Sequence, residues 1–368
     1  MQSPTKKTVL YDAHVALGAR MAPFGGFLMP IQYEGIIAEH TATRTAATVF
    51  DTCHMGQFRI SGPRACEDLE HLVSAPVATM EVGQCRYGYL CNEQGGVLDD
   101  EITYRLGPTA FMMVVNAGTQ DGDRAWIASH LSAGTVLEVL SPDMSKLDLQ
   151  GPQSARILRQ IVEQPLDGMK YYRFAGNRIA GQRVLVSRTG YTGEIGFEIY
   201  APRTMARAIW DQCLSLGAKP AGLGARDTLR LEMGFPLYGH ELSAERNAAE
   251  AGFERAIAPD KDFIGAAAVR DPAHAKQRLV GLLLDGRRAA RAHDAVADST
   301  GKQAGEVTSG SFSPSLGVSI AMAYVNKAHA APGAKLAVRT ERGDLPATVV
   351  QTPFHARATG RRPLREFL

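Results

Sequence analysis

GGVLDDEITY, residues 95–104, has the pattern of a core-forming strand but carries three consecutive acids. The glycine pair turns the chain into the strand, and side chains then alternate between its two faces. Asp100 shares a face with Ile102 and Tyr104, whereas Asp99 points to the opposite face. A carboxylate among apolar neighbours is desolvated, which favours its neutral form and suits it to proton exchange or to a hydrogen bond with a ligand nitrogen. The alternative is that Asp100 caps a turn or pairs with an arginine.

A second acidic strand follows a glycine-rich turn in TGYTGEIGFEIY, residues 189–200. Its apolar side chains form one face, and Glu198 stands on the other face with Gly196 leaving space beside it. A flat heterocycle fits such a space, because a carboxylate accepts two parallel hydrogen bonds from an amidine-like edge. The alternative is a solvated strand face with Glu194 and Glu198 exposed.

Around these two strands, β-rich runs occur in clusters with single helices between them, which predicts an α+β fold with antiparallel sheets. The predicted helices span 36–49, 63–73, 119–132, 152–163 and 203–216. The predicted strands of this region span 84–91, 96–105, 109–116, 135–140, 182–187 and 194–201. After residue 277, short strands are predicted near 304–309, 317–325, 335–340 and 346–351. Glycine, proline and asparagine turns separate them, so we interpret 277–368 as a separate all-β domain with a sandwich or barrel core.

Length and composition exclude several classes of protein. The chain has 368 residues, which is too long for one compact core, and 40 basic against 38 acidic side chains leave a net charge of +2 that disfavours nucleic acid as a partner. Its five cysteines lack C-x-x-C spacing, which disfavours a disulfide framework and a zinc site. The sequence has no secretory signal pattern and no stretch typical of a membrane span, so we expect a cytoplasmic protein. Phosphate-loop, zincin, serine-hydrolase and dinucleotide signatures are absent.

Many further motifs occur along the chain in an order that is informative as a set. They are Leu10-Tyr-Asp-Ala-His14, Pro23-Phe-Gly-Gly26, Met29-Pro-Ile-Gln-Tyr33, Glu39-His40 with Arg44, Phe50-Asp-Thr-Cys-His-Met-Gly56, Val115-Asn-Ala117, Leu149-Gln-Gly-Pro-Gln153, Gly190-Tyr-Thr-Gly-Glu194, Gly224-Ala-Arg-Asp227, Leu229-Arg-Leu-Glu232, Gly305-Glu-Val-Thr-Ser-Gly310 and Ser313-Pro-Ser315. With these motifs the chain resembles, nearly end to end, the T protein of the glycine cleavage system, an aminomethyltransferase that uses tetrahydrofolate.

The resemblance implies a three-domain, cloverleaf-like arrangement around one folate channel, with antiparallel sheets and a C-terminal β-barrel or jelly-roll-like domain. The expected first domain comprises 1–52 and 148–250 and binds folate. The expected second α+β domain comprises 53–147 and 251–276, and the expected third domain comprises 277–368. The co-substrate implied by the resemblance is tetrahydrofolate, and no metal is implied because the reactive groups arrive on the substrates.

The resemblance also assigns site residues. It makes Asp100 the key catalytic group and Glu198 the residue that clasps the pterin, the two carboxylates singled out above from strand alternation. Arg226 is expected to meet the carboxylate side of the ligand, with Arg230 as the second candidate. Arg357 is the candidate for an arginine at the folate tail. The residues expected to line the pocket are Tyr87, Met55, Tyr104, Asn116 and Tyr191.

The implied reaction takes the aminomethyl group from the lipoyl arm of the partner H protein. It yields 5,10-methylenetetrahydrofolate, ammonia and dihydrolipoyl H protein, and Asp100 is expected to orient the folate and manage its proton. Two alternatives remain at this stage: a folate-dependent demethylase of a small methylated substrate, and a non-catalytic folate-binding protein. Two departures from the family pattern are Cys53, where serine is common, and Phe235, where an aromatic hydroxyl is expected.

Overall fold

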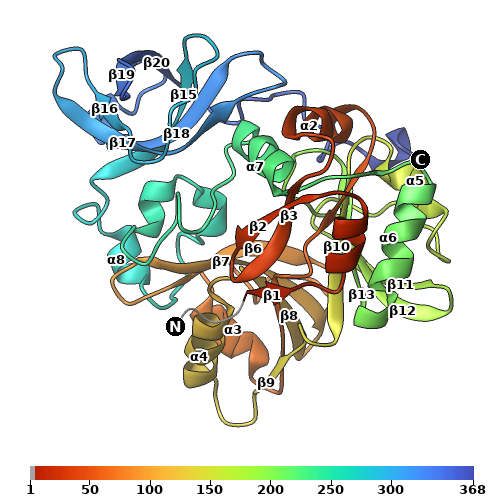
Figure 1. Cartoon of the computed structure of the whole chain (residues 1–368). Coiled ribbons are helices and arrows are strands. Elements are labelled where there is room, and N and C mark those ends of the chain that lie inside the picture. The colour runs from red at the N-terminus through yellow and green to blue at the C-terminus, as the bar shows by residue number, and fades with distance from the viewer. Residues whose placement is uncertain (1–4) are drawn as a thin grey trace.

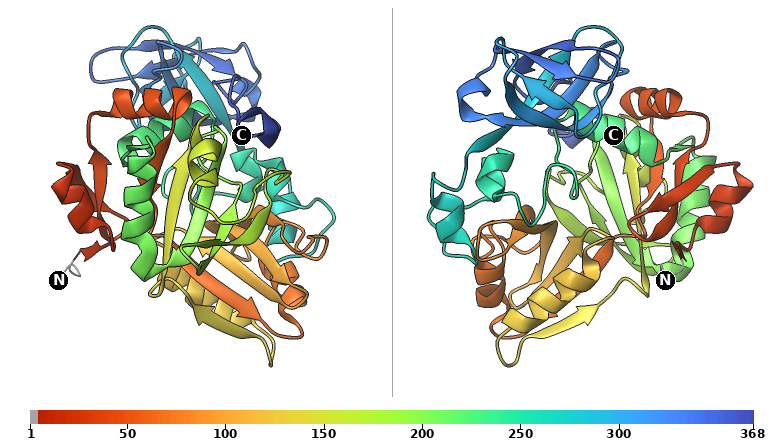
Figure 2. Two further views of the ribbon diagram at one scale, coloured as in Figure 1. Left: turned by 90° about the vertical axis from the view of Figure 1, so that its right-hand side faces the viewer. Right: turned by 60° about the vertical axis from the view of Figure 1, so that its left-hand side comes forward.

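The computed structural model describes residues 5–368, in which four β-sheets are covered by short helices. Figures 1 and 2 show three lobes: the C-terminal barrel at one end, a five-stranded sheet at the other, and a six-stranded sheet beside both. Within the described part of the chain, no helix is long and apolar enough to cross a membrane. The mixed α+β class and the closed C-terminal barrel confirm the fold predicted from the sequence.

The six-stranded sheet carries one wall of the cavity described below. Its order is β11 (Phe174–Ile179), β12 (Gln182–Ser187), β13 (Gly196–Pro202), β10 (Met144–Gln150), β4 (Thr48–Asp51) and β14 (Lys219–Pro220). One face is covered by α1 (Tyr11–Ala16), α5 (Ser154–Arg159) and α6 (Ala206–Ser215). Ile195, Phe197 and Ile199 are buried in that core together with Trp210 of α6, so the apolar face predicted for this strand is confirmed.

The five-stranded sheet has the order β6 (Cys85–Cys91), β7 (Val97–Gly107), β8 (Ala110–Val115), β5 (Gly56–Ser61) and β9 (Val136–Val139). All of its pairings are antiparallel. Helices α3 (Ala65–Leu72) and α4 (Gln120–His130) pack on one face through a core that includes Leu69, Ile127 and Phe111. The acidic segment predicted as a strand therefore lies near the middle of this sheet, in β7.

The barrel closes in the order β15 (Gln277–Leu284), β18 (Ser319–Asn326), β17 (Gln303–Phe312), β16 (Ala295–Ala297), β19 (Lys335–Arg339) and β20 (Leu345–Val350). Alternate residues such as Leu282, Val307 and Val338 fill its interior. Each of the four strand positions predicted after residue 300 coincides with one of these strands within a few residues. These four strands could be predicted from the sequence because short turns that contain glycine or proline separate them.

A small sheet and two helices connect the lobes. The sheet comprises β1 (Lys6–Lys7), β3 (Phe27–Gln32) and β2 (Arg20–Phe24), and α2 (Ile36–Thr45) packs against α7 (Leu223–Glu232). Arg44 of α2 bridges Glu194 at 2.9 Å and Glu232 at 2.8 Å, and Glu232 also accepts the hydroxyl of Ser315 from the barrel. These buried contacts connect α2 with α7, with the turn before β13 and with the barrel. The remaining helical segments are α8 (Ala266–Arg270) and the 3-10 turns Arg203–Met205, Ala248–Ala251, Glu254–Ala256, Lys327–His329 and Leu364–Glu366.

The helix predicted over 36–49 is too long, because α2 ends at Thr45 and β4 begins at Thr48. The β-branched Thr48 and Val49 pair with β10, so tertiary strand pairing overrides the helical periodicity there.

We propose that the chain divides into lobes as expected from the sequence, with two adjustments. Leu242 and Ala248, assigned to the first domain, pack with Tyr89 of the five-stranded sheet. Leu364 and Phe367, assigned to the barrel domain, pack in the core of the six-stranded sheet instead. Figure 1 shows the C-terminus close to α5, well away from the barrel strands. The apolar side chains of the tail therefore cover the first lobe rather than extending the third.

Candidate active site

A cavity of about 930 Å³ lies where the three lobes meet. Its lining comes from β7 and β8, from the face of the six-stranded sheet opposite its helices, from α7 and the loop after it, and from β17. The residues predicted for the site that line it are Met55, Tyr87, Asp100, Asn116, Tyr191, Glu198, Arg226 and Arg230. Segments far apart in the sequence therefore bring eight of the ten expected side chains to one cavity.

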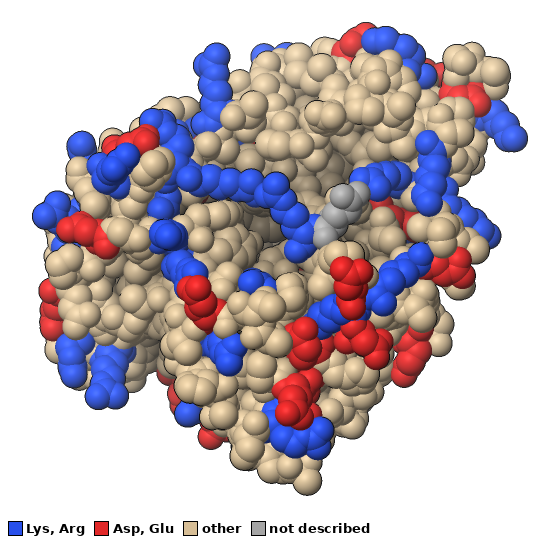
Figure 3. All heavy atoms as spheres, turned by 180° about the vertical axis from the view of Figure 1, so that it is seen from behind, with Lys and Arg blue, Asp and Glu red and all other residues tan. Residues whose placement is uncertain are grey.

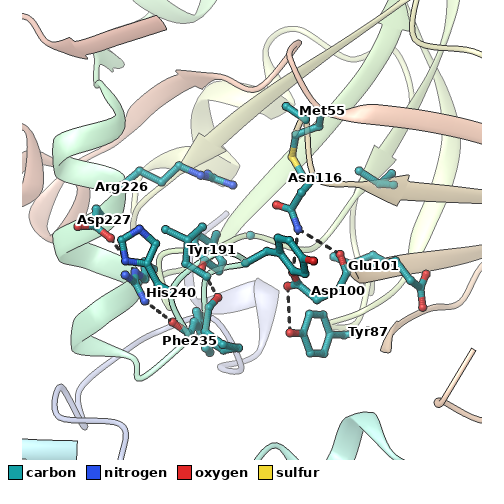
Figure 4. A pocket seen from close by; sticks show the side chains of 18 of the residues that line it. Met55, Tyr87, Asp100, Glu101, Asn116, Tyr191, Arg226, Asp227, Phe235 and His240 are labelled. Carbon is teal, nitrogen blue, oxygen red and sulfur yellow. Dashed lines mark hydrogen bonds and ion pairs between the residues drawn. The ribbon is translucent and has the colours of Figure 1, made fainter. Parts of the chain in front are cut away.

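Asp100 projects from β7 into this cavity between two hydrogen-bond donors (Figure 4). The Tyr87 hydroxyl donates to its Oδ2 at 3.0 Å, and Nδ2 of Asn116 donates to its Oδ1 at 2.7 Å. Burial and the neighbouring charge of Asp99 raise the pKa of Asp100 to about 7. A carboxyl group with such a pKa exchanges its proton at neutral pH, which is the property required of a general acid or base.

Glu198 lies on β13 and is ionised, unlike Asp100. Its Oε1 accepts from Nζ of Lys146 at 2.6 Å, and its Oε2 accepts from the hydroxyls of Thr189, Tyr104 and Tyr200 at 2.7, 3.0 and 3.1 Å. Burial raises the pKa of Glu198, but the Lys146 charge and these hydrogen bonds outweigh burial and hold it at about 2. The cavity thus combines one fixed carboxylate with one that titrates near neutrality.

The space expected beside Glu198 is occupied by a side chain of the protein. A Cβ on Gly196 would lie 2.3 Å from the carboxamide of Gln150, and one on Gly190 would meet the same group. These glycines therefore make room for Gln150, which hydrogen-bonds Asp148 and Thr189. The prediction of an open slot over Gly196 was wrong, because strand alternation on β13 alone does not say which side chain the neighbouring β10 contributes.

The two candidate arginines on α7 differ in their burial and in the number of groups that they hydrogen-bond. Arg226 pairs with buried Asp148 at 2.5 Å and lies 5.0 Å from the ring centre of Tyr191. Arg230 is almost fully buried and bonded to Asp227, Glu241, Ser309 and the carbonyl of Phe235. Arg230 therefore ties α7 to the barrel, whereas the Arg226 side chain keeps some exposure.

Two expected residues do not line the cavity. Tyr104 is fully buried behind Glu198, to which it donates its hydroxyl hydrogen bond. Arg357 is exposed in the C-terminal tail, outside the lining, whereas Arg361 from the same tail does line the cavity. The segment that holds Arg357 and Arg361 is neither helix nor strand. The sequence therefore has no periodicity there that would show which arginine faces inward.

The two departures from the family pattern fit their surroundings. Cys53 donates its thiol to the carbonyl of Lys146 at 3.4 Å, and burial together with Asp51 raises the pKa of Cys53 well above its usual value, so the thiol stays protonated. Phe235 stacks on Tyr191 with ring centres 5.8 Å apart. The tyrosine hydroxyl beneath it reaches the carbonyl of Pro236. Neither departure places a reactive group in the site.

Sequence reasoning missed Lys146 and His54, which both line the cavity. The alternation in Lys146-Leu-Asp-Leu-Gln150 is a strand signal with polar side chains on one face, and it would have identified Lys146. Burial lowers the pKa of His54 to about 4, so it is neutral at physiological pH between the rings of Phe24 and Phe27. No cluster of three or more metal-ligating side chains is found among residues 5–368.

Charge on the molecular surface is mixed. Figure 3 shows one face on which Lys and Arg side chains alternate with Asp and Glu around a central hollow. This face carries no continuous basic field of the kind that holds a nucleic-acid backbone.

Comparison with known proteins gives the same family along most of the chain. A family model described as the GCVT N-terminal domain matches residues 10–261, and one described as the glycine cleavage T-protein C-terminal barrel domain matches residues 277–355. The aminomethyltransferase of Saccharopolyspora erythraea is 44% identical, with 97% of this chain and 100% of that protein covered. The aminomethyltransferase of Desulforamulus reducens is 40% identical, with 96% and 98% covered.

A solved structure agrees with these sequence matches. The glycine cleavage system aminomethyltransferase T from Bartonella henselae superposes with a TM-score of 0.90 at 33% identity, covering 96% of this chain and 99% of that one. Family models, full-length relatives and fold all coincide, and the chain belongs to the glycine cleavage T-protein family.

Proposed function

We propose that this chain is a tetrahydrofolate-dependent aminomethyltransferase of the glycine cleavage system. It takes the aminomethyl group carried by the lipoylated H protein and yields 5,10-methylenetetrahydrofolate, ammonia and dihydrolipoyl H protein. The names of its full-length relatives support the aminomethyltransferase activity. The observation that carries the chemistry is one cavity lined both by Asp100, whose pKa is about 7, and by ionised Glu198.

The lining of the cavity suits a folate. Its volume of about 930 Å³ lies near the upper end of the range of roughly 300–1,000 Å³ typical of small-molecule sites. Tyr87, Met55 and Tyr191 supply the aromatic and apolar surface that a flat pterin and its benzoyl ring require. Arg226 and Arg361 supply positive charge for the glutamate carboxylates. Tetrahydrofolate supplies the amine nitrogens that accept the one-carbon unit.

Glu198 has capacity for one more donor. Three hydroxyls surround Oε2, but Oε1 receives only Lys146, so a lone pair remains there for an N–H of the aminopyrimidinone edge. A permanently ionised acceptor fixes that edge without competing for protons in the pH range of the reaction. Lys146 holds the carboxylate in place, because it is itself buried and bonded to it.

Asp100 has the complementary property. Its two oxygens accept hydrogen bonds from Tyr87 and Asn116, which fix its orientation, while its raised pKa lets it take or release a proton. We assign it the management of the proton at the reacting nitrogen, an acid–base and positioning role worth about 10²–10⁴ in rate. Cys53 is buried and protonated, so a covalent step through that thiol is not needed for this scheme.

The test is tetrahydrofolate-dependent release of ammonia from aminomethylated H protein. We expect the wild-type chain to release ammonia, and Asp100→Asn to bind tetrahydrofolate nearly as well while turnover falls at least 10²-fold. Asp211→Asn is the matched control, because Asp211 is an exposed aspartate paired only with Arg207 on its own helix. Absence of ammonia release by the wild type, with rapid demethylation of a small methylated amine or thioether, would overturn the proposal.

Glu198→Ala tests the binding role separately. Loss of the carboxylate leaves Lys146 and the folate edge without their shared acceptor, so the dissociation constant for tetrahydrofolate is expected to rise at least 10-fold. Isothermal titration calorimetry in the absence of H protein measures that constant. An unchanged dissociation constant would remove Glu198 from the binding site.

A further inference from the structure

We propose that Asp99 and Asp123 form a carboxyl–carboxylate pair that shares one proton and acts as a positioning device for Asn116, and through Asn116 for Asp100. Neither residue lines the cavity. The assignment of Asp100 as the catalytic group rests on the proposed function, but the protonation of the pair is testable without any activity.

Asp99 accepts hydrogen bonds from Asn116 on both of its carboxyl oxygens. Oδ2 accepts from the backbone N–H of Asn116 at 2.9 Å, and Oδ1 accepts from the side-chain Nδ2 at 2.8 Å. Asp99 is fully buried, so this two-point contact is shielded from water. Burial raises the pKa of Asp99, and its two hydrogen bonds from Asn116 oppose that rise because they favour the ionised form.

These two hydrogen bonds determine the orientation of the Asn116 carboxamide. One N–H of Nδ2 is directed to Asp99, and the other is directed to Oδ1 of Asp100 at 2.7 Å. The opposite orientation would set the carboxamide oxygen against two carboxyl oxygens. Figure 4 shows the resulting geometry, in which Asn116 and Tyr87 approach Asp100 from different sides.

The strand register explains why Asn116 can reach both acids. Antiparallel pairing of Ile102 with Val114 brings the residues after β8 level with Asp100 on β7. Asn116 lies one residue beyond the end of β8, where the chain leaves the sheet for α4. Asp99 points toward that helix, and Asp100 points into the cavity, so one carboxamide spans the two sides of the strand.

Asp123 holds the proton that the pair needs. It lies on α4, is buried, and its carboxyl group is hydrogen-bonded to that of Asp99. Two ionised carboxylates do not form a hydrogen bond, and Asp99 is committed as an acceptor to Asn116, so Asp123 must be the donor. Oδ2 of Asp123 is buried and finds no N–H or O–H donor in the described part of the chain, as expected of the oxygen that carries a proton. Burial and the Asp99 charge raise the pKa of Asp123 to about 9, in agreement with this assignment.

The other titratable groups around Asp100 leave Asp99 as its anionic neighbour at neutral pH. Burial raises the pKa of each surrounding tyrosine and raises that of Glu101 to about 8. These groups are Tyr87 and Tyr89 on β6, Tyr191 before β13, Tyr238 after α7 and Glu101 on β7. Asp123, which would be a further anion, is neutralised by the shared proton. The Asp99–Asp123 pair therefore has two effects. It orients Asn116, which donates to Asp100, and it places a single negative charge next to Asp100.

Three variants separate this role from a merely structural one. Asp123→Asn keeps an N–H donor to Asp99, whereas Asp123→Leu has a similar volume and no donor. Asp99→Asn removes the negative charge. It also replaces one of the two oxygens that accept hydrogen bonds from Asn116 with an amide N–H donor. We expect Asp123→Asn to retain within about threefold of the turnover and Asp123→Leu to lose at least 10-fold. For Asp99→Asn we expect a loss of at least 10²-fold, and the limb of the pH–rate profile that reports Asp100 moves to lower pH, because an anion that raises its pKa is gone.

Infrared difference spectroscopy tests the shared proton independently of catalysis. The wild-type spectrum minus that of Asp123→Asn at pH 7 is expected to contain one protonated-carboxyl band. A carboxylate band in that difference, or equal turnover for the Asn and Leu variants at position 123, overturns the proposal. If the wild type itself releases no ammonia, the proposed function fails, and the infrared result still decides the state of the pair. Thermal unfolding of each variant identifies any that do not fold, and the Asp123→Asn spectrum does not depend on the other two.

Discussion

Lys146→Met is the perturbation whose magnitude follows most directly from the structure. Lys146 and Glu198 are both buried and 2.6 Å apart, so the substitution leaves a carboxylate in the interior without its cation. Holding the pKa of Glu198 at about 2 instead of the ordinary 4.5 is worth about 3 kcal/mol at pH 7, at about 1.4 kcal/mol per tenfold. The free energy of unfolding is expected to fall by about that amount, which agrees with the roughly 3–5 kcal/mol typical of breaking one side of a buried pair.

The dependence of this loss on pH has a definite sign. A carboxyl group whose pKa is depressed in the folded state contributes stability that is fully present above the unfolded pKa of 4.5 and is lost as the pH falls through about 2. The difference between wild type and Lys146→Met is therefore expected to be largest at neutral pH. It narrows as the pH is lowered toward 3.

Urea unfolding followed by tryptophan fluorescence measures the effect. Trp210 lies in the core of the six-stranded sheet, so a Trp126→Phe background makes it the reporter of that lobe. Lys219→Met is the matched control, because Lys219 and Glu34 form an exposed pair at 2.9 Å that is worth at most about 1 kcal/mol. The double variant with Glu198→Gln should recover part of the loss, since no unpaired carboxylate is left at position 198. The reasoning is refuted if Lys146→Met costs no more than the control, or if the double variant is less stable than the single one.

Three further outcomes follow from the site. In steady-state assays, the pH profile of kcat/KM should show a limb near pH 7 that is abolished in Asp100→Asn, because burial and Asp99 raise the pKa of Asp100 to about 7; a profile unchanged by the substitution contradicts its role. Calorimetry should give at least a fivefold weaker binding of tetrahydrofolate for Arg361→Ala and no change for Arg357→Ala, since Arg361 lines the cavity and Arg357 does not; the reverse order would place the other arginine at the ligand. Cys53→Ser should leave turnover within about twofold, because burial and Asp51 keep the thiol protonated; a loss above 10-fold would indicate a role for the thiol.

The strands that could be predicted from the sequence are those in which polar and apolar residues alternate and glycine-containing turns mark both ends. The barrel strands β17 to β20, together with β7 and β13, fall within a few residues of their predicted positions because alternation and glycine turns bound them. The hairpin over residues 20–32 and strand β10 were not predicted. The alternation of β10 is visible in the sequence, but the sequence does not show that the polar face of this strand, which carries Lys146, is buried.

The sequence by itself determined the family, the α+β class, the C-terminal β-rich region and the two acids, Asp100 and Glu198, that alternation sets apart on their strands. Those inferences depend on residues near each other in the chain. The tertiary structure decided how the two acids differ. Glu198 is ionised because β10 places the Lys146 ammonium against it, whereas burial and the charge of Asp99 raise the pKa of Asp100 to about 7. Protonation depends on which charges meet across a dry interior, and that proximity exists only after the lobes have packed together.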